Sequence, residues 1–99
     1  MKKWKKTFSY IQCFKNYEIE LTWDFFIKGL NENLEYCFYY ENLVIDIAFH
    51  YEDERKIYEI NITDGDLHTH FSFNTVDELV YCKVINNKSI YDMWDELEN

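Results

Sequence analysis

The sequence of 99 residues contains no proline and only two glycines. These scarcities exclude glycine-rich phosphate loops, dinucleotide-binding fingerprints, collagen repeats and proline-rich linkers. No apolar run approaches the ~20 residues that a membrane-spanning helix needs. Apolar residues nevertheless make up 47% of the chain and aromatic residues 20%, which is too many for a disordered protein. The length fits a single domain over residues 1–99.

Basic residues are also scarce. Ten lysines and arginines stand against nineteen aspartates and glutamates, which gives a formal net charge of −9. Four lysines lie within the first six positions, so residues 7–99 carry six basic and nineteen acidic side chains, a charge of −13. A protein that binds nucleic acid or an anionic membrane needs a basic face. The sequence therefore predicts no direct nucleic-acid or membrane partner.

The chain has three cysteines, Cys13, Cys37 and Cys82, and no C-x-x-C pair. An odd number at wide spacing disfavours a disulfide scaffold and a zinc knuckle. We expect buried, reduced thiols in a cytoplasmic protein. Amino acids with AT-rich codons dominate the composition, which indicates a low-GC bacterium, its phages or its mobile elements as the source.

Hydrophobic spacing predicts helices at both ends of the chain. Residues 3–16 carry apolar side chains at steps of three and four, and residues 23–34 do the same behind a capping Thr22. Near the C-terminus, Thr75 with Glu78 and Ser89 with Asp92 have the spacing of capping boxes. Each pair precedes a helical stripe of apolar residues.

Between these helices the hydrophobic period changes to two. Strands are predicted over residues 36–40, 43–51, 58–62 and 67–73, with a charged loop at 52–55 and a tight Asp64-Gly65 hairpin turn. The predicted fold class is α+β, an antiparallel meander of three to four strands with helices packed on one face.

A metal site is an alternative that the polar face of this sheet leaves open. If Asp64-Gly65 forms the turn, Asp46, Asn61 and His68 share one row across the strands, and Glu59 and His70 share the next. Histidines and carboxylates are common metal ligands. An ordinary solvated face explains the same pattern, so no metal or other cofactor is predicted. If a metal site exists on this face, its candidate ligands are Asp46, Glu59, His68 and His70.

The acidic residues are the main functional signal. Glu52, Asp53 and Glu54 fall at one predicted hairpin tip, and Glu41, Asp64 and Asp66 fall at the opposite end of the meander. A domain with this much negative charge can imitate a polyanion and dock in a protein groove that binds phosphates. Its carboxylates would pair with the lysines and arginines of this basic protein. The residues predicted to bind this partner are Glu52, Asp53, Glu54, Asp92, Asp95 and Glu96.

Two segments resemble the C-terminal part of small orphan proteins of low-GC Gram-positive bacteria and their phages. They run from Phe73 to Leu79 and from Lys88 to Leu97, and they consist of capped helices with one tryptophan. In size and charge the chain is also similar to anti-CRISPR inhibitors. This second resemblance implies a small inhibitor that occupies the nucleic-acid groove of a larger enzyme by charge imitation.

No complete catalytic motif is present, so the sequence predicts an inhibitor and not an enzyme. Three alternatives stay open. The first is an immunity protein that neutralises a bacterial toxin, and the second is a small metal-dependent enzyme that uses the sheet face. The third is an accessory protein that assembles with itself, as a homodimer, through its aromatic surface.

Overall fold

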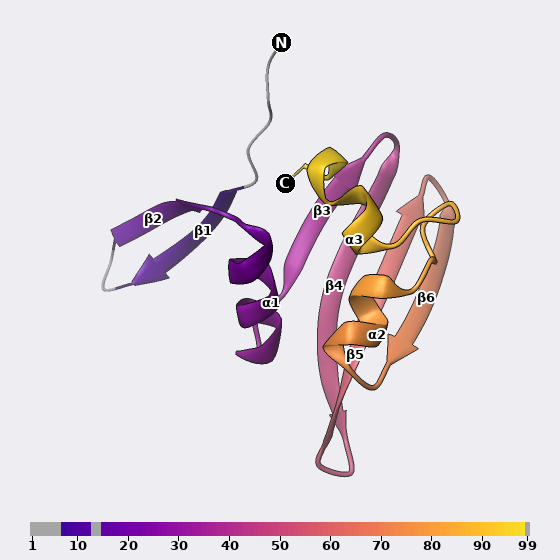
Figure 1. Ribbon diagram of the computed structural model, residues 1–99, viewed down its shortest axis with the longest axis horizontal. Helices are drawn as coiled ribbons and strands as arrows, with labels where there is room; N and C mark the ends of the chain where they lie inside the picture. The colour runs from indigo at the N-terminus through magenta and orange to yellow at the C-terminus, as the bar shows by residue number, and fades with distance from the viewer. Residues whose placement is uncertain (1–6, 13–14, 99) are drawn as a thin grey trace.

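The computed structural model describes residues 7–12 and 15–98, with side chains from residue 20 onward. Its main feature is a four-stranded antiparallel sheet in the order β3-β4-β5-β6, covered on one face by helices (Figure 1). The fold is therefore α+β, as predicted. The elements are β1 (Thr7–Gln12), β2 (Lys15–Glu20), α1 (Trp23–Asn31), β3 (Tyr36–Tyr40), β4 (Leu43–Glu52), β5 (Arg55–Asp64), β6 (Leu67–Phe73), α2 (Val76–Tyr81), α3 (Ile90–Met93) and the short 3-10 helix η1 (Trp94–Glu96).

The prediction of a helix over residues 3–16 is wrong for the part of this segment that the structure describes. Residues 7–12 and 15–20 are strands β1 and β2, which form a separate antiparallel pair with Tyr10 opposite Tyr17. Positions 3–6, 13 and 14 of the predicted helix lie outside the described residues. The apolar spacing of this short segment fits either element, and pairing with the next segment decides in favour of the strand.

The predicted register of the meander is correct for the turn between β4 and β5 and wrong for the turn between β5 and β6. Asp46 lies opposite Asn61 and Ala48 opposite Glu59, as the predicted loop at residues 52–55 requires. At the next turn the two loop residues are Gly65 and Asp66, because glycine takes the first loop position with a φ of 60°. The β6 partners therefore shift by two residues. His70 lies opposite Asn61, Ser72 opposite Glu59, and His68 opposite Thr63.

Side-chain caps start the helices where the sequence predicts. The Thr22 hydroxyl accepts a hydrogen bond from the backbone N–H of Phe25, and Thr75 accepts one from Glu78. Ser89 and Asp92 form a complete capping box. Helix α1 ends at Asn31, three residues before the predicted end. The chain turns there with a positive φ of 67° at Asn33, and the N–H of Leu34 reaches back to the carbonyl of Gly29.

One hydrophobic core joins the helices to the inner face of the sheet. Alternation along β4 and β5 directs Ile45, Ile47 and Ile60 to this face, each at most 1% exposed. Burial of each such side chain is worth about 1.5–3 kcal/mol. The core residues contributed by helices and their connections include Phe26, Leu30, Leu79, Val80, Ile85, Ile90 and Met93.

The cysteines are less buried than predicted. Cys37 is half-buried on the outer face of β3, and Cys82 is exposed after α2; both are free thiols. Cys13 lies outside the described residues. Within residues 7–12 and 15–98, no helix is both long and apolar enough to cross a membrane.

Candidate functional site

The turn between β4 and β5 carries three consecutive acidic residues, Glu52, Asp53 and Glu54, and all three are exposed. In Figure 1 this hairpin projects beyond α1 and α2 at the bottom of the view. Glu52, the last residue of β4, lies opposite Arg55, the first residue of β5. The structure thus presents three of the six predicted partner-binding residues together, at the tip of a projecting hairpin, which we call the acidic finger.

The backbone of the acidic finger is strained. Asp53 and Glu54 have φ values of 48° and 69°, in the left-handed region that glycine and asparagine adopt most readily. Elsewhere such φ values occur at three asparagines, Asn33, Asn86 and Asn87, and at one other glutamate, Glu41 with a φ of 52°. Two-residue hairpin loops with two positive φ values favour Asn-Gly or Asp-Gly, and a glutamate in the second position is unfavourable. The acidic finger therefore keeps a carboxylate at a cost in conformational energy.

The other three predicted partner-binding residues lie on α3 and η1, and two of them have partners within the chain. The carboxylate of Asp92 accepts a hydrogen bond from the backbone N–H of Ser89 and lies 3.3 Å from Lys83 Nζ. Glu96 lies 3.8 Å from Lys88 Nζ. Hydrogen bonds from Ser89, and then the lysine charge, lower the pKa of Asp92. Asp95 is exposed.

These two groups of carboxylates lie at opposite ends of the sheet. Glu98 pairs with Tyr39, which in turn lies opposite Val44 near the start of β4. The acidic finger begins at Glu52, at the other end of β4, which is about 26 Å away at ~3.3 Å per residue. The predicted partner-binding residues therefore form two surfaces. Asp64 lies opposite Leu43, so it shares the end far from the acidic finger, as predicted.

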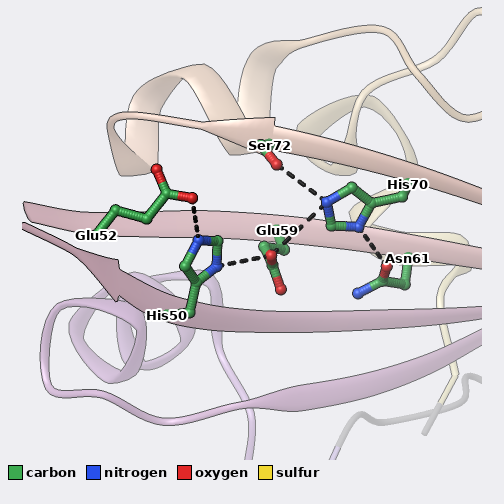
Figure 2. Close-up of polar contacts among 6 residues, drawn as sticks. All are labelled: His50, Glu52, Glu59, Asn61, His70 and Ser72. Atoms are coloured by element: carbon green, nitrogen blue, oxygen red, sulfur yellow. Dashed lines mark hydrogen bonds and ion pairs between the residues drawn. The ribbon is translucent and has the colours of Figure 1, made fainter.

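The outer face of the sheet carries a cluster of two histidines around one glutamate, shown in Figure 2. Glu59 Oε1 lies 2.7 Å from His50 Nδ1 and 3.7 Å from His70 Nε2. The other ring nitrogen of His50 lies 2.9 Å from Glu52 Oε1. His70 is also hydrogen-bonded to Asn61 and Ser72, with distances of 2.6 Å and 3.0 Å.

This cluster favours a charged His50. Hydrogen bonding to Glu52 is the largest cause of a raised pKa at His50. Desolvation opposes it, and the negative charges of Glu59 and Glu52 raise the pKa further. His50 is not among the residues that the sequence placed in rows across this face. Its direct partner on β5 is Ile57, and it reaches Glu59 diagonally across the ladder.

The structure brings together only part of the predicted metal-ligand set. Glu59 and His70 are neighbours, whereas His68 lies beside Thr63, 3.3 Å from its hydroxyl. Asp46 lies next to Cys37, whose pKa is raised by burial and by a hydrogen bond to the Asp46 carboxylate. In the part of the chain that the structure describes, no three His, Cys, Asp or Glu side chains are arranged to hold one metal ion. The contact between His50 and Glu59 has the length of a hydrogen bond.

No protein-family model, no curated protein and no solved structure matches the chain.

Proposed function

We propose that the protein is a non-enzymatic inhibitor that inserts its acidic finger into the basic nucleic-acid groove of a larger enzyme. The observation that carries this proposal is the exposure of three consecutive carboxylates on one projecting tip, two of them at positions of positive φ. Residues in such strained conformations cluster at functional sites. Three adjacent carboxylates at such a point can occupy the place of backbone phosphates.

The basic side chains of the protein neutralise only a small part of its negative charge, which supports the same proposal. Residues 20–98 contain eighteen acidic side chains and only five basic ones. Lys56 donates to the Leu30 carbonyl and lies over the rings of Phe49 and Tyr58, so it is turned toward the body. Lys83 lies against the carboxylate of Asp92, and Lys88 lies against that of Glu96. The remaining negative charge attracts a basic partner over long range.

A basic groove binds an acidic finger by the forces that bind nucleic acid. Its lysines and arginines form charge-assisted hydrogen bonds with carboxylates, and the occupied groove then excludes the substrate. The anti-CRISPR-like form of this proposal names a CRISPR effector nuclease as the enzyme. An immunity protein against a nuclease toxin would use the same surface, so the identity of the partner separates the two.

Capture of the partner from the lysate of the source organism tests this proposal. The immobilised wild-type protein is compared with a triple variant, Glu52→Gln, Asp53→Asn and Glu54→Gln, which removes the charge of the acidic finger. A control variant, Glu41→Gln, Asp64→Asn and Asp66→Asn, removes the same charge at the far end of the meander.

We expect the wild type and the control to retain a basic, nucleic-acid-processing enzyme and to block its activity. We expect the finger variant to bind it about tenfold more weakly, or worse. Equal loss in the two variants would show that only net charge matters. Capture of no basic partner, or full binding by the finger variant, would contradict the proposal.

A further inference from the structure

A hollow of about 370 Å³ lies between the start of α1 and the C-terminal helices, separate from the acidic finger. Its walls combine aromatic rings with carboxylates, and both kinds of group attract cations. The tryptophans are half-buried, whereas the tyrosine and both aspartates are exposed at the rim. The residues that line the hollow are Trp23, Tyr91, Asp92, Trp94 and Asp95.

The aromatic walls are held in fixed orientations. The ring of Trp23 lies at 82° to that of Trp94 and at 79° to that of Tyr91, with centroids 5.2 Å and 5.3 Å apart. Trp94 is supported from beneath by Phe26 and Phe38, with centroid distances of 4.9 Å and 5.8 Å. Both of these phenylalanines are completely buried. The site is thus built before any ligand arrives, which reduces the entropy lost on binding.

The two aspartates at the rim differ in their surroundings. Asp92 is fixed by the capping box with Ser89 and lies 3.3 Å from Lys83 Nζ. Asp95 follows Trp94 directly and is exposed, and no lysine, arginine or histidine of the described residues forms an ion pair with it. A carboxylate beside aromatic faces adds a second attraction for a cation that the rings alone would bind weakly.

We propose that this aromatic hollow receives the guanidinium group of an arginine side chain from the partner. A guanidinium is planar and weakly hydrated, so it can lie against a tryptophan face and donate through its edge to Asp95. A lysine ammonium is compact and strongly hydrated, and it fits this combination of rings and one carboxylate less well. The inference rests on the proposed function and extends it, because it gives the basic partner a second contact about one sheet length from the acidic finger.

Titration of the full chain with a small arginine analogue tests the inference without any partner. The probe is N-acetyl-L-arginine methylamide, and the matched control is the citrulline compound, which has nearly the same shape and no charge. The readout is the indole N–H signals of Trp23 and Trp94 in a ¹H–¹⁵N NMR spectrum. We expect saturable shifts of both signals with the arginine compound, with a Kd on the order of 1 mM. We expect none with citrulline and severalfold weaker binding of the lysine analogue.

Two exposed positions provide variants that should fold. Asp95→Asn removes the rim charge and should weaken arginine binding about three- to tenfold. Asp66→Asn, in the turn between β5 and β6, removes the same charge elsewhere and should leave binding unchanged. Equal affinity for citrulline or for lysine, or unchanged binding by the Asp95→Asn variant, would overturn the inference.

The outcomes are separable from those of the partner capture. If the arginine compound binds but no basic enzyme is captured, the hollow is a cation site and the proposed function fails. If a basic enzyme is captured through the acidic finger but the arginine compound does not shift either tryptophan, the proposed function stands and this inference fails.

Discussion

His50 on β4 and Glu59 on β5 share a hydrogen bond of 2.7 Å that crosses the sheet diagonally. The second nitrogen of the same imidazole lies 2.9 Å from Glu52, at the base of the acidic finger. One histidine therefore links the outer face of the sheet to the acidic finger. Because both of its nitrogens lie against carboxylates, the imidazolium form is favoured.

This arrangement predicts a pH dependence of stability. The pKa of His50 is raised above its ordinary 6.5 in the folded protein. Its contribution is therefore fully present below about pH 6.5 and is lost as the pH rises through the higher folded value. We expect the His50→Gln variant to lose less stability than the wild type between about pH 6 and pH 8. Urea unfolding at both pH values measures this difference. An NMR titration that places the His50 midpoint at or below 6.5 would contradict it.

Contact between α1 and β3 depends on Gly29. A β-carbon at this position would overlap the hydroxyl oxygen of Tyr36 and would lie only 3.0 Å from Leu34 Cδ1. We expect Gly29→Ala to destabilise the protein by about 1–3 kcal/mol, although alanine is the better helix former. Tyr36→Phe removes the overlapping atom and should restore much of this loss. A double-mutant cycle measures the coupling, and additive effects would show that the contact is not the cause.

The strain of the acidic finger predicts a gain in stability when its turn is idealised. Replacement of Asp53-Glu54 by Asn-Gly suits the two positive φ values and should raise the free energy of unfolding by about 1–2 kcal/mol. Glu54→Gln removes charge without relieving the backbone, and it should leave stability nearly unchanged. Chemical denaturation distinguishes the two variants. If the Asn-Gly variant is no more stable than Glu54→Gln, the turn is not strained.

The two C-terminal capping residues should differ in importance. Ser89 is 2% exposed and belongs to a reciprocal capping box, whereas Thr75 is an exposed cap. We expect Ser89→Ala to cost about 1–2 kcal/mol and Thr75→Ala about 0.5–1 kcal/mol. Thermal unfolding of the two variants measures the order. The reverse order would indicate that α3 is held by its apolar face alone.

Local signals in the sequence predicted much of the fold. The strand over residues 36–40, the first hairpin of β4 and β5, and the three helix starts depend on alternation and on caps within a few residues. The register of β6 was missed by two residues, because the position of Gly65 within its turn decides it. The strand pair at the N-terminus was missed because a partner strand can override the helical spacing of a short segment.

The sites depend on contacts that sequence spacing does not reveal. Trp23 and Trp94 are 71 residues apart in the sequence, and only the packing of α3 and η1 against the start of α1 brings their rings together. The predicted rows do not contain His50, because its directly opposite residue on β5 is Ile57, although long side chains also reach diagonal neighbours. In contrast, the three carboxylates of the acidic finger are adjacent in sequence, so their common exposure followed from the hairpin alone.

The salt dependence of binding shows whether the acidic finger holds the partner by charge imitation. The dissociation constant of the captured enzyme is measured with the wild type and with the uncharged finger variant at several salt concentrations, from about 50 to 300 mM. We expect wild-type affinity to fall steeply with salt and the slope to be clearly smaller for the finger variant. The same slope for both proteins, or affinity that does not change with salt, would contradict it.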